Sequence, residues 1–197
     1  MKKLVLFSLL IIASIQLKAH RDSLWVDGRY YTTDQYKNNE FESWFMPGGG
    51  YSIYKPEASD SLGMFSGIAI EFAIYTKVDQ NDNPGPSHVR WYTKFNLNSS
   101  SKDGVSDLFL YSMGIDLSLE KNPKRNFLIP YFGLEVGGIS HKAFGTSINF
   151  TPLAGIHLLS TRKLFVNVHG GYLYPVRNFE YLQGWFAYAG INFALWQ

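Results

Sequence analysis

Two histidines and a carboxylate are the side chains whose types and spacing could do chemistry in this chain. His157 and His169 share one face of neighbouring predicted strands, and Glu135 has the same parity on a nearby strand. Two imidazoles and a carboxylate can bind a metal ion or transfer protons. No short H-x-x-x-H spacing supports a metal site, and structural hydrogen-bond networks use the same residues. We therefore expect a structural role, without a metal or a cofactor.

Charged residues share the parity of these histidines and suggest two alternatives. They are Asp27, Arg29, Glu71, Asp116 and Glu135. Inside a barrel they could line an ion-selective or substrate-contacting pore. The other alternative is a paired ionic network that fills the interior, because charges removed from water must be paired and a small barrel barely holds its own side chains. We expect the network, and a narrow pore is the second hypothesis.

Alternation of large apolar residues with small or polar ones predicts the strands that position these side chains. Every second residue is large and apolar in 68–74, 109–119 and 128–136. A period of two places one set on each face of a β-strand. Strands are predicted at 24–33, 45–55, 64–77, 107–119, 127–140, 147–158, 163–174 and 184–196.

The connections between these strands predict how they are joined. Short polar segments at 56–62, 120–126 and 159–163 alternate with connections that are mostly longer. This pattern is typical of an all-β, eight-stranded antiparallel up-and-down barrel. The strand-like segment 88–97 fits as a hairpin arm inside the longest loop, 79–105. If that segment were a full strand, the count would be nine.

The composition of the two faces predicts which one meets lipid. The face opposite the apolar one is rich in Gly, Ala and Ser and carries only isolated charges. A soluble exterior would carry Lys or Glu at most alternate positions. The large apolar residues are therefore expected to face lipid, over strands of about 9–11 residues, which makes the barrel transmembrane. A soluble lipocalin-like barrel remains the alternative.

Overall composition excludes several classes of protein. The net charge is +2, too balanced for a general nucleic-acid binder, which neutralises phosphates with basic residues. The chain has no Cys, which excludes disulfides, thiol catalysis and Cys-ligated zinc. We expect no nucleic-acid partner.

The N-terminus predicts export. Lys2 and Lys3 precede the apolar run 4–15, so residues 1–19 are expected to be a signal peptide and 20–197 the barrel domain. An uncleaved anchor is the alternative, although the run is shorter than the roughly 20 residues of a transmembrane helix.

Two predicted loops carry aromatic and basic residues that could contact an external protein or a small ligand. These residues are Arg90, Trp91, Tyr92, Arg177, Phe179 and Tyr181. Packing of the loops onto the barrel mouth explains the same residues equally well. Residues 79–83 (DQNDN) resemble the start of a calcium loop, but Pro84 and Arg90 replace its glycine and glutamate, so this is not an EF-hand. Turn chemistry explains these residues without a metal, and loose calcium binding by a surface loop is the alternative.

A resemblance to a known family lies in two strands. Residues 129–138 (IPYFGLEVGG) follow a strand and a polar turn and resemble the aromatic–glycine strand of small outer-membrane β-barrel proteins of Gram-negative, Bacteroidetes-type bacteria. Residues 190–195 (GINFAL) resemble the closing strand, although the chain ends in Trp196–Gln197 rather than in an aromatic residue. The resemblance implies an outer-membrane location, with membrane lipid and the barrel-assembly machinery as partners, more than an activity.

Small barrels of this membrane include lipid A deacylases and acyltransferases, which need a serine, a histidine and usually a carboxylate. Ser140 and His141 are adjacent at a predicted strand end, but no G-x-S-x-G motif is present. We predict no catalytic residues. The expected function is therefore non-enzymatic: a structural or surface-interaction barrel that acts through extracellular loops, with both termini periplasmic. A narrow pore, a lipid-modifying enzyme and a lipocalin-like binder are the alternatives.

Overall fold

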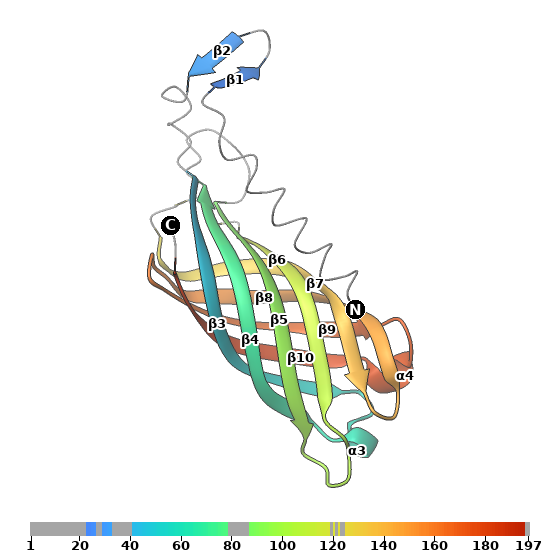
Figure 1. Ribbon diagram of the computed structural model, residues 1–197. Coiled ribbons are helices and arrows are strands. Elements are labelled where there is room, and N and C mark those ends of the chain that lie inside the picture. Colours follow the sequence, from blue (N-terminus) through green and yellow to red (C-terminus); the bar gives the residue numbers. More distant parts are fainter. Residues whose placement is uncertain are drawn as a thin grey trace. The chain divides into compact units, whose positions relative to one another are not determined.

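Eight antiparallel strands close into a barrel in which neighbours in sequence pair and the last strand pairs with the first (Figure 1). The computed structural model describes residues 23–26, 29–32, 41–78, 87–118, 120, 122 and 125–195, with the backbone alone for the residues up to 42 and for 78. The chain divides into two units, Met1–Glu40 and Phe41–Gln197. The second unit contains the barrel and confirms the predicted all-β, up-and-down fold.

The barrel strands are long, and their bounds follow the alternating pattern closely. They are β3 (Phe41–Pro56), β4 (Phe65–Val78), β5 (His88–Ser100), β6 (Leu108–Ser118), β7 (Phe127–His141), β8 (Gly145–Ser160), β9 (Leu164–Pro175) and β10 (Gly184–Phe193). Two single-turn helices, α3 (Ser59–Leu62) and α4 (Phe179–Leu182), lie in connections. No helix of the described segments is long and apolar enough to cross a membrane.

The number of barrel strands was predicted correctly, but two assignments were wrong. Segment 88–97 is not a hairpin arm: it belongs to β5, which pairs with both β4 and β6. The segment predicted at 24–33 is not a barrel strand, because β1 (Ser23–Val26) and β2 (Arg29–Thr32) form a separate two-stranded sheet. The predicted signal peptide, 1–19, lies outside the described residues.

These two corrections change which connections share an end of the barrel. Connections 57–64, 101–107, 142–144 and 176–183 lie at one end, called here the helical end because it carries α3 and α4 (Figure 1). At the other end, the terminal end, β4, β6 and β8 end, β5, β7 and β9 begin, and the start of β3 and the end of β10 lie. Short segment 56–62 therefore lies at the end opposite the one where β6 ends and β7 begins, and the predicted alternation of short and long connections is wrong.

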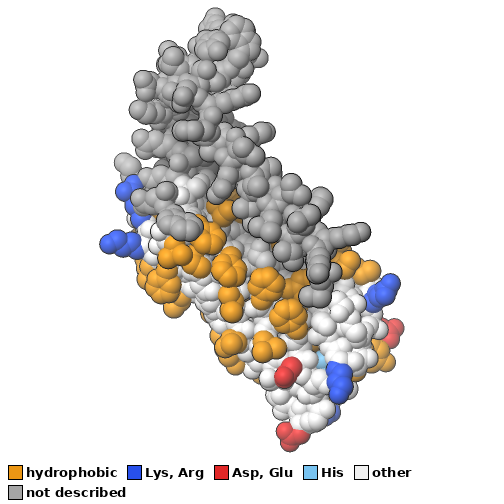
Figure 2. All heavy atoms as spheres, in the orientation of Figure 1, with side chains coloured by type: hydrophobic (Ala, Val, Ile, Leu, Met, Phe, Trp, Pro, Cys, Tyr) orange, Lys and Arg blue, Asp and Glu red, His pale blue; other side chains and the backbone are white. Residues whose placement is uncertain are grey.

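The outer wall of the barrel is apolar. Ile70, Phe72 and Leu134 point outward with 54%, 45% and 45% of their surface exposed, as the predicted lipid-facing parity requires. Among the described outward positions of the barrel strands, Lys55 is the charged one, and it lies next to the end of β3. Figure 2 shows hydrophobic side chains along the visible wall and charged ones toward its two ends.

The interior is packed in layers. One apolar cluster includes Leu62 of α3 and Leu182 of α4, packed with Phe65 and Phe186 beneath the helical end. A second cluster, with Trp44 among its members, gathers residues closer to the terminal end. Charged and polar side chains fill the space between the clusters. Tyr54 is fully buried in the first cluster.

Glycines on the inner face make room for the tyrosines beside them. Tyr131 of β7 and Gly155 of β8 are paired across the two strands. A methyl group on Gly155 would lie 2.6 Å from the Tyr131 ring. A methyl group on Gly190 would likewise clash with the Tyr188 ring. At these two positions the missing side chain therefore leaves room for a tyrosine ring against the sheet.

Candidate functional site in the barrel interior

Arg90, on the inner face of β5, joins two carboxylates from the strands on either side. Its Nη1 lies 3.0 Å from Glu71 Oε1 of β4, and its Nη2 lies 2.5 Å from Asp116 Oδ2 of β6. The Nε group also donates a hydrogen bond to Asp116 at 2.7 Å. All three side chains are fully shielded from solvent. The guanidinium therefore ties three consecutive strands together through two buried ion pairs.

Aromatic and amide groups complete the surroundings of Arg90. The guanidinium carbon lies 4.3 Å from the centre of the Tyr92 ring and 5.4 Å from that of Phe165. With its oxygen turned toward Arg90, the Asn167 amide accepts a hydrogen bond from the guanidinium. Ring faces attract cations, and they do so more strongly where water is excluded.

Lys94, four residues further along β5, forms a second ionic group. Its Nζ lies 2.5 Å from Glu135 Oε1 and 4.5 Å from the centre of the Tyr188 ring. The same carboxylate oxygen accepts a hydrogen bond from the Tyr92 hydroxyl at 2.8 Å. Tyr92 thus contacts both ionic groups, since its ring faces Arg90 and its hydroxyl contacts Glu135.

His169 is held as a neutral ring by its two partners. Its Nε2 lies 3.2 Å from Lys94 Nζ, which has only hydrogens to donate, so Nε2 must accept. Nδ1 then carries the proton and donates to the Tyr131 hydroxyl at 2.9 Å. The ring therefore neither accepts a further proton nor offers a free lone pair to a metal without losing one of these contacts.

His157 occupies the adjacent strand and is packed by aromatic rings. Its ring stacks on Tyr131 at 4.0 Å between centroids, and its Nδ1 has no hydrogen-bond partner. Toward the terminal end, Ser160 donates to the Tyr75 hydroxyl at 2.8 Å, which contacts His88 Nδ1 at 2.7 Å. No group of three His, Asp or Glu side chains in the described segments could hold a metal ion.

The structure brings most of the predicted interior residues together. Glu71, Asp116, Glu135, His157 and His169 are all buried on the inner face. Asp27 lies outside the described residues, and so does the side chain of Arg29 in β2. Strand β2, which carries Arg29, belongs to the separate two-stranded sheet, so Arg29 does not have the predicted place on the inner face of a barrel strand.

The cations that pair with the interior carboxylates are Arg90 and Lys94. Both lie in segment 88–97, which the sequence predicts as an arm of the longest loop and not as a barrel strand. Arg90 and Tyr92 are buried inside, and Trp91 points outward from the wall, so none of these three is a loop residue. The available signal was the register of β5 itself: Arg90, Tyr92 and Lys94 alternate with outward Trp91 and Phe95 as in the other strands.

The second predicted loop cluster does lie in a connection at the helical end. Arg177 is exposed there, and α4 exposes Phe179 and Tyr181. Phe179 stacks near Tyr174 of β9, and Tyr181 stacks on Phe144 of the neighbouring connection at 5.5 Å. These rings pack against the barrel mouth and still expose part of their surface.

Ser140 and His141 do not form a catalytic pair. Ser140 pairs with outward Phe109, and its hydroxyl accepts a hydrogen bond from Thr146. His141 is buried on the inner face, where Nδ1 accepts the Ala143 amide and Nε2 contacts the Ser106 carbonyl. Adjacent residues of a strand point to opposite faces, which separates the two side chains.

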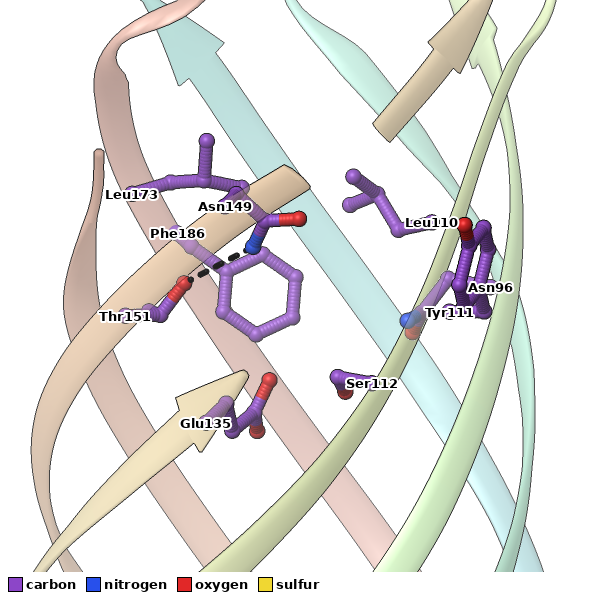
Figure 3. A pocket seen from close by; sticks show the side chains of 9 residues that line it. All are labelled: Asn96, Leu110, Tyr111, Ser112, Glu135, Asn149, Thr151, Leu173 and Phe186. Atoms are coloured by element: carbon purple, nitrogen blue, oxygen red, sulfur yellow. Dashed lines mark hydrogen bonds between the residues drawn. The ribbon is translucent and has the colours of Figure 1, made fainter. Parts of the chain in front are cut away.

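The interior leaves little free space. The pocket drawn in Figure 3 has a volume of about 10 Å³, room for a single water molecule. Arg90, Lys94 and Glu71 in the middle of the interior have no exposed side-chain surface. A continuous aqueous channel would expose such residues, so the described barrel is filled rather than open.

The fold and the interior together define a class: a closed eight-stranded barrel with an apolar wall and a packed, ionic interior. No family model matches the chain, and no curated protein matches it in sequence. Among solved structures it is similar to the crystal structure of Neisserial surface protein A (NspA), with 16% identity and a TM-score of 0.49. That match covers 78% of this chain and 98% of the Neisserial chain. The fold assignment rests on the closed strand order of the barrel itself.

Proposed function

We propose that this protein is a non-conducting barrel of the bacterial outer membrane with a structural or surface-interaction role. The observation that carries the proposal is the reversed polarity of the barrel: the wall is apolar, and ionised residues are paired inside. In water such a wall would expose an apolar surface far larger than soluble monomers carry. In a bilayer it is the favoured arrangement, because a closed barrel also satisfies every strand edge.

The dimensions of the wall support this location. On β4 the outward residues between Ser66 and Thr76 are apolar: Ile68, Ile70, Phe72 and Ile74. At about 3.3 Å per residue and a tilt of about 40°, the span between these polar residues is roughly 25 Å tall. That height matches the apolar band of outer-membrane barrels. A signal peptide at 1–19 would provide the export that this location requires.

The packed interior supports a structural role over a pore or a carrier. A lipocalin-like carrier needs an apolar cavity for its ligand, whereas this interior is filled and ionic at its centre. The helical end offers the exposed side chains Arg177, Phe179 and Tyr181 for contact with an external protein or small ligand. We place that end outside the cell and the terminal end, with both chain ends, in the periplasm, where the barrel-assembly machinery would meet the chain. Kinship with Bacteroidetes-type barrels remains a prediction from residues 129–138.

Fractionation and conductance test the proposal directly. We expect the protein to sediment with outer membranes, to resist alkaline carbonate, and to migrate faster on gels before boiling than after it. In planar bilayers we expect no resolved conductance steps. A protein that stays soluble without detergent would contradict the membrane location, and reproducible conductance steps would contradict the closed interior.

A further inference from the structure

Lys55 is a cation on the outer wall of the barrel, beside the helical end. It is exposed on the outward face of β3, one outward position beyond Ile53. Ile53 pairs with Ser66, the residue at which the apolar outward series of β4 stops. The ammonium group therefore lies where the apolar band ends, which is the level of the lipid headgroups in the proposed membrane location.

No group in the described part of the chain neutralises this ammonium. It takes part in no hydrogen bond or ion pair with a described residue. Glu57, the nearest carboxylate along the chain, is already engaged. One of its oxygens accepts a hydrogen bond from the Tyr172 hydroxyl, and the other accepts one from the Gln183 side-chain amide at 2.7 Å. Lys55 therefore offers a free positive charge to whatever surrounds the wall.

Two aromatic residues continue the row that Lys55 begins. Lys55 pairs with Trp185 of β10, and Trp185 pairs with Tyr172 of β9, so the three residues follow one another across three strands. The Trp185 and Tyr172 rings meet edge to face with 5.3 Å between their centres, and Trp185 is 65% exposed. Such rings favour the boundary between headgroups and hydrocarbon. The row therefore presents a cation next to an exposed aromatic ring at that boundary.

On four other strands the wall is uncharged next to the helical end. The outward residues there are neutral hydroxyl side chains, Ser66 of β4, Ser99 of β5, Ser140 of β7 and Thr146 of β8. A neutral hydroxyl does not distinguish a charged headgroup from an uncharged one. The row of Lys55, Trp185 and Tyr172 differs from these sectors by its net charge.

We propose that this row binds one membrane lipid with an anionic phosphate headgroup, an inference that rests on the proposed membrane location. Lys55 contacts the phosphate, and the exposed Trp185 ring packs against the upper part of the acyl chains. Phosphate is the anion that the headgroups of anionic membrane lipids present at this level. A lysine ammonium is a compact point charge, so the charge of the headgroup rather than its shape selects the lipid.

Quenching of Trp185 fluorescence in bilayers tests this site. In a variant that keeps Trp185 and replaces the other tryptophans by phenylalanine, brominated phosphatidylglycerol and brominated phosphatidylcholine are compared at the same low mole fraction in phosphatidylcholine vesicles. Because both lipids carry the bromine at the same depth, their ratio does not depend on the depth of the ring. We expect the anionic lipid to quench more strongly, as for an about fivefold higher local concentration.

Three variants control this measurement. Lys55→Gln should abolish the preference for the anionic lipid at Trp185. Lys142→Gln removes an exposed lysine from a connection of the same end and should keep that preference. A variant that keeps only Trp91, on the outward face of β5, should show no preference.

Equal quenching of Trp185 by the two lipids would overturn the proposal. A preference that Lys55→Gln retains, that Lys142→Gln loses, or that Trp91 shares would overturn it as well. These results would leave the membrane location intact, because a brominated lipid reaches either ring only in a bilayer. If neither lipid quenches Trp185 and aqueous iodide does, the membrane location fails, and the lipid site fails with it.

Discussion

The ring of Tyr92 lies over Gly114, its cross-strand partner on β6, so closely that a methyl group on the glycine would fall 2.3 Å from the ring. Held in this position, the Tyr92 hydroxyl reaches Glu135 at 2.8 Å while its ring faces the Arg90 guanidinium at 4.3 Å. A missing side chain on one strand thus decides where an aromatic side chain of the next strand can lie. That position in turn links the two buried ionic groups.

Gly114→Ala tests this dependence. The added methyl group would displace the Tyr92 ring and weaken its contacts with Glu135 and Arg90, so we expect a loss of about 1–3 kcal/mol in the free energy of unfolding. Urea titration of the barrel in detergent micelles measures it. Gly170→Ala is the control, because its methyl group would meet nothing nearer than the Phe186 carbonyl oxygen at 3.6 Å. Equal stabilities of the two variants would contradict the steric role of Gly114.

Arg90→Met should destabilise the barrel strongly. It leaves Glu71 and Asp116 without their shared cation in a buried region, for which a loss of about 3–5 kcal/mol is typical. The triple variant Arg90→Met, Glu71→Gln, Asp116→Asn removes the unpaired charges and should recover part of that loss. Both effects can be measured on gels as the fraction of unboiled protein that keeps the faster mobility of the folded barrel at each urea concentration. A single variant as stable as wild type would show that the ion pairs contribute little.

The direction of the outer face can be tested on one strand. Ile70→Lys places an ammonium group near the middle of the wall, where we expect a loss of about 2–4 kcal/mol in lipid bilayers. Ser66→Lys lies on the same face of β4 near the helical end and should cost no more than about 1 kcal/mol. Unfolding from lipid vesicles in urea compares them. If Ile70 faced water, its replacement by lysine would be neutral, as would that of Ser66.

Trp91 and Trp44 provide a spectroscopic test of the same assignment. Trp91 points outward from β5 and is 58% exposed, whereas Trp44 is 2% exposed inside the barrel. In variants that keep one of the two and replace the other tryptophans by phenylalanine, brominated lipid should quench Trp91 fluorescence and leave Trp44 nearly unchanged. Quenching of Trp91 fluorescence by aqueous iodide but not by brominated lipid would instead mean that Trp91 faces water, as in the predicted loop.

Local alternation was sufficient to predict most of the strands and their outward faces. The segment predicted at 127–140 differs from β7 by one residue, and its outward residues Phe132, Leu134 and Val136 are those that the alternation indicated. This works because a residue's face in a strand depends only on its parity, and lipid requires apolar side chains along the whole outer face. The burial of Glu71, Asp116 and Glu135 followed from the same parity.

The sequence alone therefore determined the class of secondary structure and the side of the sheet that is apolar. The predicted count of eight barrel strands was right because one segment wrongly included, 24–33, offset one wrongly excluded, 88–97. Only the tertiary structure decided that 88–100 is a barrel strand and that 24–33 is not, because a strand belongs to a barrel through its pairing with neighbours, a non-local property. For the same reason the partners of Arg90 and Lys94 come from strands whose register no local pattern contains. Closure of the sheet brings these side chains together, and closure is a property of all the strands at once.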